Sequence, residues 1–297
     1  MNFSSDGTQC NGTDPIIGTH YANRHYVVNG QSNHVYENIS GITIRSMGMV
    51  MPTVTLGISI TQGTGSMSVT TGLIYWLTEY DSTRGIESVA GATSPEPGAF
   101  DSKDGVYLTI TGSKLNAIAD SYRLYRTVDG GVFPDGMLIE TLAGTSTFTL
   151  DQNINTSSLL APFYGTIEIG GLDYDRDTPP PALSCIWGPF EDSLMAFGRD
   201  DPRSIIYTAV GRPESWPLGY VIPLQTERQD IGMCGALVNG VAVAFTRDTM
   251  YRVSRLPREL DSAFAGGEVI ELITKERGAV SRRGVTLFTI PGVGTFL

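Results

Sequence analysis

Apolar and polar residues alternate over short stretches along the whole chain, and turn-forming residues separate these stretches. Ser121–Thr127 is a clear example, with Tyr122 and Leu124 on one face and Arg123 and Tyr125 on the other. A period of two is typical of a half-buried β-strand. No amphipathic pattern with the helical period continues for more than about three turns. The pattern predicts an all-β protein.

The middle of the chain, residues 52–155, contains many short strand-like stretches with turn residues between them. Such spacing over about 100 residues is typical of a β-sandwich. We expect the side chains of Tyr75, Leu77, Tyr122 and Leu124 to point into its core.

Residues 1–51 and 183–297 flank this region, and we expect them to belong to one other domain. Residues 156–182 are acidic and proline-rich, and the run Pro179–Pro181 predicts an extended linker outside any sheet. After it, strands come in groups of four over about 45 residues, with Asn239–Gly240 as a hairpin turn. This predicts a partial β-propeller of four-stranded blades, interrupted by the sandwich.

A further group of strands is expected to begin at Val269 and to stop at Leu297, so the blades are expected to be incomplete.

Net charge and hydropathy reduce the number of functions that the chain could have. The formal net charge is −11, which disfavours a conventional DNA-binding surface. The adjacent pair Arg282–Arg283 is the one candidate for a local nucleic-acid contact, and we expect it to be ordinary surface. No run approaches the roughly 20 apolar residues of a membrane span.

The sequence offers few residues for chemistry. The three cysteines, Cys10, Cys185 and Cys234, are far apart and odd in number, which favours buried reduced thiols. We find no nucleophile elbow and no phosphate-binding glycine loop. No spacing singles out a pair of carboxylates. The turn Asp129–Gly131 matches an aspartate box poorly and is interpreted as a hairpin turn. We therefore expect no enzyme activity and no cofactor.

Two patterns suggest metal ligands but have simpler interpretations. Asp173, Asp175 and Asp177 have the alternate spacing of a calcium loop, yet the glycine and glutamate that such a loop needs are missing, so we expect a solvated acidic linker. The only histidines are His20, His25 and His34. We expect them to be ordinary surface residues, although His25 and His34 come close if a hairpin joins them. No metal site is therefore predicted.

Several short motifs resemble segments of phage tail proteins with β-propeller cores, the tail nozzle or tail tubular protein B family of short-tailed phages. These motifs are Ser204–Trp216, Val241–Thr246, Met250–Val253 and Gly278–Val285. The middle of the chain resembles an inserted fibronectin type III or immunoglobulin-like domain. Within the motifs, the residues expected to have structural roles are Tyr207, Gly211, Pro213, Glu214, Trp216, Phe245, Thr246, Tyr251, Gly278 and Ser281.

The resemblance implies a structural component of a virion tail, made in the host cytoplasm. It implies a homo-oligomeric ring of six copies that serves as the tube for DNA ejection. Its other partners would be tail proteins such as an adaptor and tail fibres. Viral DNA would pass through it without specific binding.

Acidity suits such a tube, because carboxylates repel phosphate over about 10 Å at moderate salt and so keep DNA from sticking. We expect loops around Asp192, Asp200, Asp201 and Asp230 to face the channel. The alternative is that the acidity only keeps the protein soluble.

Two other functions fit the same pattern. One is a carbohydrate-binding, glycan-cleaving or receptor-binding tail propeller, in which Trp187 and Trp216 would stack on sugars. The other is a generic adhesion module with a sandwich domain. Exposed, clustered aromatic residues and a trimeric spike would favour these functions, whereas buried aromatic residues and a ring would favour the tube.

Overall fold

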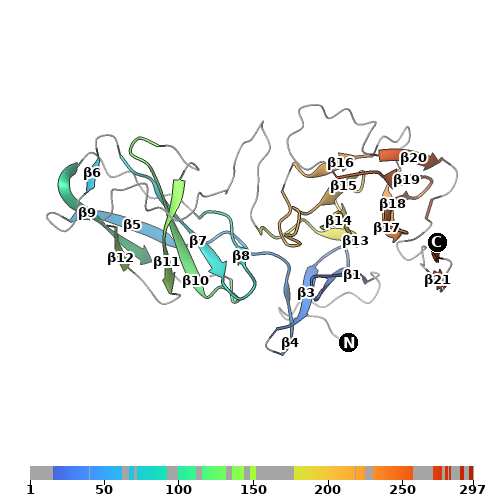
Figure 1. Cartoon of the computed structure of the whole chain (residues 1–297), viewed down its shortest axis with the longest axis horizontal. Coiled ribbons are helices and arrows are strands. Elements are labelled where there is room, and N and C mark those ends of the chain that lie inside the picture. The colour runs from blue at the N-terminus through green and yellow to red at the C-terminus, as the bar shows by residue number, and fades with distance from the viewer. Residues whose placement is uncertain are drawn as a thin grey trace. The chain divides into compact units, whose positions relative to one another are not determined.

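The structure is a computed structural model that describes residues 16–39, 41–61, 67–69, 72–91, 100–111, 116–131, 136–143, 148–151, 177–217, 219–224, 230–256, 270–275, 278–279, 281, 288–290 and 294–296. All regular secondary structure within these residues is β-strand, so the predicted all-β class is confirmed (Figure 1). A helix able to cross a membrane does not occur among them.

The chain divides into two compact units. The flanking unit contains the described residues up to Met47 and those from Pro179 onward. The inserted unit contains the described residues from Gly48 to Asp151, together with Asp177 and Thr178. Along the described residues, the chain therefore leaves the flanking unit just after Met47 and returns to it at Pro179.

Three four-stranded antiparallel sheets make up most of the flanking unit, and in each the strands pair in chain order. The first sheet consists of β1 (Ile17–Tyr21), β2 (Arg24–Val28), β3 (Asn33–Asn38) and β4 (Ile42–Ser46). The second consists of β13 (Leu183–Phe190), β14 (Ser193–Gly198), β15 (Ser204–Tyr207) and β16 (Val221–Pro223). The third consists of β17 (Gly232–Val238), β18 (Val241–Thr246), β19 (Met250–Val253) and β20 (Ile270–Thr274).

Each of these sheets has the strand order of a propeller blade, and their first strands are neighbours, with β13 in contact with both β1 and β17. Alternation along β13 explains why the second sheet packs on both faces. Ile186 lies in a core shared with Tyr26 and Val28 of the first sheet. The adjacent Trp187 lies in a core shared with Ala244 of the third sheet.

The third sheet differs from the expected strand grouping in two respects. Ile270–Thr274 pairs with β19 and completes this sheet, so it does not open a new group. The stretch from Gly232 to Val238 is one strand, where the sequence pattern predicts two, at Ile231–Cys234 and at Leu237–Val238. Gly235 lies in the middle of this strand, where a Cβ atom would meet the ring of Trp187 at 2.2 Å. Glycine occurs at this position because the Trp187 ring leaves no room for a side chain, and the strand continues through it.

The hairpin turn predicted at Asn239–Gly240 is confirmed. It joins β17 to β18 with two residues whose φ angles are 51° and 78°. Both lie in the left-handed region that asparagine and glycine tolerate best, as a type I′ turn requires. A separate two-stranded hairpin is formed by β21 (Phe288–Ile290) and β22 (Gly294–Phe296).

The inserted unit contains two four-stranded antiparallel sheets. One consists of β5 (Thr55–Thr61), β6 (Met67–Val69), β9 (Phe100–Thr111) and β12 (Phe148–Asp151). The other consists of β7 (Tyr75–Asp81), β8 (Ile86–Glu87), β10 (Ser121–Thr127) and β11 (Gly136–Ala143). Their shared core contains Leu56 of β5 and Leu108 of β9. It also contains the four residues that the alternation predicted, Tyr75, Leu77, Tyr122 and Leu124.

The acidic segment before the prolines differs from the prediction. Asp177 is buried, and it exchanges hydrogen bonds with Glu87 through its backbone N–H (3.0 Å) and its Oδ2 (2.8 Å). The expectation of a solvated linker is therefore wrong at this residue, because its carboxylate is used to fix the backbone of β8. Asp173 and Asp175 lie outside the described residues. Pro179–Pro181 form no strand, and the carbonyl of Pro181 accepts a hydrogen bond from Asn33 Nδ2 at 2.8 Å.

Candidate functional site

The turn after β15 carries four of the predicted motif residues, Gly211, Pro213, Glu214 and Trp216. Gly211 begins it with a φ of +68°, a conformation that glycine adopts without strain, and its N–H donates to the Asp192 carbonyl at 2.8 Å. The N–H of Ser215 donates to the Arg212 carbonyl at 3.0 Å and closes the turn. Pro213 is buried in it. This geometry fixes where the side chains of the next residues point.

Trp216 points from this turn into the core between the first and second sheets. It is 5% exposed and packs with Tyr26, Val28 and Leu194. Trp187 is buried in the neighbouring core, where its ring centre lies 5.1 Å from that of Phe197. The third tryptophan of the chain, Trp76 in β7, is also buried. No tryptophan of this chain therefore offers a surface on which a sugar could stack.

Glu214 is buried beside Trp216 and binds two arginines of the first sheet. Arg45 donates from Nη1 to Oε2 at 2.6 Å and from Nη2 to Oε1 at 2.5 Å. Arg24 donates from Nη1 to Oε1 at 3.2 Å. A bidentate arginine–carboxylate pair is among the strongest and most directional of hydrogen-bonded contacts.

Glu37 in β3 completes a buried charge network of Arg24, Glu37, Arg45 and Glu214. Its carboxylate accepts from Arg45 Nε at 3.1 Å and lies 3.3 Å from Arg24 Nε. Arg24 and Glu37 are direct cross-strand partners. The four formal charges sum to zero, and each arginine contacts both carboxylates. This pairing offsets the cost of removing the charges from water.

The network fixes the protonation state of Arg45 and of the neighbouring Tyr26. Burial acts to lower the pKa of Arg45, but hydrogen bonds to Glu214 and Glu37 and the charges of both outweigh it, so the pKa lies above its ordinary value. Burial, and after it the charge of Glu214, raises the pKa of the adjacent Tyr26 hydroxyl. The guanidinium therefore stays charged and the phenol stays protonated. The arrangement can hold two sheets together, and it presents no activated nucleophile.

The other predicted motif residues lie in or beside the second and third sheets. Phe245, Thr246 and Tyr251 are buried in β18 and β19. Gly278 lies against the backbone of Thr246, where a Cβ atom would meet the Thr246 carbonyl at 2.3 Å, so that only glycine fits. Ser281 is exposed.

Tyr207, at the end of β15, stacks on Tyr220 with ring centres 4.9 Å apart. The structure thus brings Gly211, Pro213, Glu214 and Trp216 together at the first sheet, and it places Phe245, Thr246, Tyr251 and Gly278 together in and beside the third sheet.

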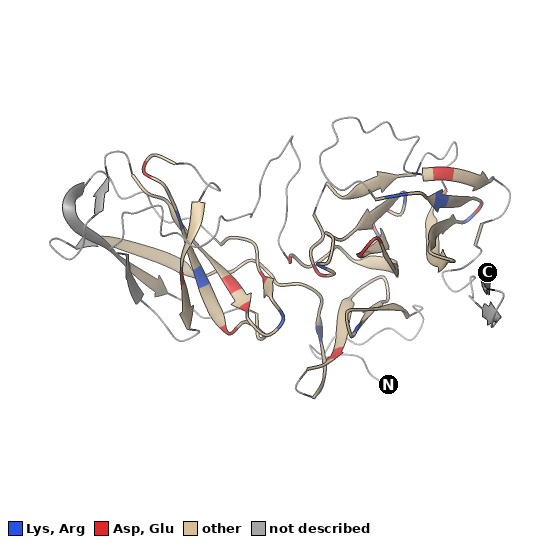
Figure 2. Cartoon of the chain, in the orientation of Figure 1, with Lys and Arg blue, Asp and Glu red and all other residues tan. Residues whose placement is uncertain are grey.

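Of the four acids expected to face a channel, three are on the surface. Asp192, Asp200 and Asp201 are exposed. Asp230 is only 4% exposed. Its carboxylate accepts hydrogen bonds from the Thr246 and Thr249 hydroxyls and from the N–H of Ile231. The expectation is therefore corrected for Asp230, whose carboxylate is used inside the third sheet. Figure 2 shows the acidic and basic positions of the described chain.

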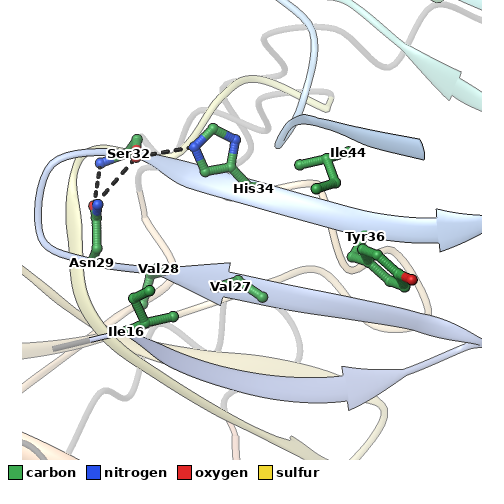
Figure 3. A pocket seen from close by; sticks show the side chains of 8 residues that line it. All are labelled: Ile16, Val27, Val28, Asn29, Ser32, His34, Tyr36 and Ile44. Carbon is green, nitrogen blue, oxygen red and sulfur yellow. Dashed lines mark hydrogen bonds between the residues drawn. The ribbon is translucent and has the colours of Figure 1, made fainter. Parts of the chain in front are cut away.

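A small hollow on the first sheet is lined by Ile16, Val27, Val28, Asn29, Ser32, His34, Tyr36 and Ile44 (Figure 3). It encloses about 10 Å³, which is the room that one water molecule needs. Pockets for small molecules are usually above about 300 Å³. His34 is buried here with a ring nitrogen 3.0 Å from Ser32 Oγ, so the expectation that all three histidines lie on the surface is wrong for His34.

Sequence reasoning singled out Glu214 but missed its partners Arg24, Glu37 and Arg45. A signal for them exists in the strand alternation. Arg24 shares a strand face with Tyr26 and Val28, which are core residues, so the period of two places its charge on the inward face. A charged residue at such a position predicts a buried partner.

Comparison of the chain with models of known protein families and with curated proteins finds no match.

Proposed function

We propose that the chain is a structural, non-enzymatic subunit of a bacteriophage virion tail, which assembles with copies of itself into a ring through which DNA leaves. The observation that carries this proposal is the turn Gly211–Trp216. It resembles a motif of tail nozzle proteins, and here its Glu214 and Trp216 are both buried against the first sheet. A motif whose distinctive side chains join two sheets has a structural role.

The packing of the flanking unit supports this proposal, because it suits a tube wall that must resist distortion. The second sheet is covered on both faces by apolar cores. The buried charge network adds directional contacts between the first sheet and the turn, because each arginine bonds with fixed geometry. A tube wall through which DNA moves needs this combination of tight packing and defined orientation.

The surface charge supports passage of DNA without binding. Asp192, Asp200 and Asp201 are exposed in loops of the second sheet, and we propose that they face the channel. Carboxylates release no counterions from phosphate, so they add no affinity for the duplex. The same acids would also keep an individual subunit soluble. Ejection kinetics distinguish this role from lining the channel, if they are measured for the triple variant Asp192→Asn, Asp200→Asn and Asp201→Asn. Slower ejection is expected, and unchanged ejection would contradict the channel position.

Native mass spectrometry of the purified full chain tests the assembly. We expect a closed ring of identical copies, with a hexamer as the form that the nozzle resemblance implies. A trimer that binds host glycans would instead support a receptor-binding tail protein. A chain that stays monomeric at all concentrations and in the presence of other tail proteins would contradict the proposal.

A further inference from the structure

His20 and His25 face each other across the first hairpin of the chain. β1 and β2 are joined by the two-residue turn Ala22–Asn23, and the register pairs His20 with His25. Tyr21 and Arg24 flank the turn, so the next pair along the strands is one that exchanges no hydrogen bonds, and its side chains approach most closely. Both histidines are exposed, and their ring centres are 4.7 Å apart.

This separation suits two imidazoles that share one metal ion. Zinc lies about 2 Å from a ligating imidazole nitrogen, and so about 3 Å from the centre of that ring. Two rings held at about 90° around one ion then have centres between about 4 and 5 Å apart. The observed 4.7 Å falls in this range. The rings are tilted by 59°, so they are not stacked face to face.

The electrostatic surroundings also favour a cation. Arg24 is next to His25 in the strand, but alternation places its guanidinium on the opposite face, where Glu37 and Glu214 bind it. The chain as a whole carries a formal charge of −11, which attracts divalent cations to its surface.

We propose that His20 and His25 form a two-ligand surface site for a divalent transition-metal ion of the zinc or nickel class. Imidazole is a preferred ligand of these ions. No group of three or more histidine, cysteine, aspartate or glutamate side chains suitable for a metal occurs in the described part of the chain. We expect water to complete the coordination shell. His34 is not a ligand, because it is buried and a ring nitrogen contacts Ser32 Oγ.

Calorimetric titration of the full chain with Ni²⁺ tests this site, with protein made without a histidine tag. Nickel is preferable to copper because it does not oxidise the three thiols of the chain. We expect one ion per chain for the unaltered protein. The variants His20→Gln and His25→Gln should each weaken binding about tenfold or more, because the second ligand then no longer acts within the same molecule.

The double variant supplies the sharper test. If one ion bridges the two rings, each single variant should keep only the weak binding of one imidazole, and His20→Gln combined with His25→Gln should lose binding at this site altogether, whereas independent sites would bind two ions per chain and lose one ion in each single variant. The control His34→Gln should leave the affinity within about twofold of the unaltered protein. Two ions per chain, of which each single variant loses one, or an affinity that none of these histidine variants changes, would overturn the proposal. A loss in His34→Gln equal to that in His20→Gln would overturn the assignment of the ligands.

Discussion

Arg45 of β4 and Glu214 of the turn after β15 form a buried bidentate pair, with N–O distances of 2.6 and 2.5 Å. They are 169 residues apart in the sequence, and the inserted unit occupies most of the chain between them. The pair therefore joins the two parts of the flanking unit that the insertion separates. This makes the first sheet and the turn one structural element.

Removal of the carboxylate charge at Glu214 should strongly destabilise the flanking unit. Glu214→Gln leaves Arg45 and Arg24 with only Glu37 as a buried anion, and such a loss costs about 3–5 kcal/mol. Urea unfolding followed by tryptophan fluorescence measures it. The matched control is Glu271→Gln, whose exposed carboxylate lies 3.9 Å from Arg252 and should change stability by less than about 1 kcal/mol. Equal effects of the two variants would contradict the role of the network.

Trp216 should act through its packing. Trp216→Ala removes a large side chain from the core that Tyr26, Val28 and Leu194 share, and this should lower the free energy of unfolding by about 3–5 kcal/mol. Trp216→Phe should cost less because it leaves a smaller cavity. Thermal unfolding and the assembly state of both variants give the result. Normal stability with loss of host attachment would point instead to a receptor-binding residue.

Gly235 should not tolerate even one added methyl group. In Gly235→Ala the new Cβ would meet the Trp187 ring at 2.2 Å, and relief of such overpacking typically costs about 1–3 kcal/mol. Gly198→Ala is the control, since its nearest contact would be an ordinary 3.4 Å. Denaturant midpoints of the two variants should differ clearly. A Gly235→Ala protein as stable as Gly198→Ala would show that the second and third sheets are not packed as described.

The buried thiol of Cys234 predicts a loss of stability in alkali. Burial raises its pKa to about 11, whereas in the unfolded chain the pKa is near its ordinary value of 9.0. Below pH 9 both states hold the proton and the stabilisation is complete. Between about pH 9 and 11 only the unfolded state loses it, so stability falls as pH rises, by about 2 kcal/mol in all.

Other groups titrate in the same range, so the comparison is with Cys234→Ala. Stability curves measured from pH 8 to pH 11 should fall less steeply for this variant, whatever its stability at neutral pH. Parallel curves for the two proteins would show that the thiol is accessible to water in the folded state.

Local sequence patterns predicted the features that depend on local physics. Asn239–Gly240 specifies its turn because both residues accept positive φ, and the alternation in β7 and β10 placed Tyr75 and Leu124 in the core. The inward charges were missed because the partner of Arg45 lies 169 residues away. Asp230 and His34 were expected on the surface because their burial comes from neighbouring strands and turns, whose arrangement the local pattern does not specify.

The most direct test of the central proposal is quantitative mass spectrometry of particles purified from the source of this sequence. If the chain is a tail subunit, its peptides will be found in the particles at a fixed ratio to the other structural proteins, with a number of copies that matches the ring formed by the purified chain. Particles that are infectious and contain none of this chain would contradict the account.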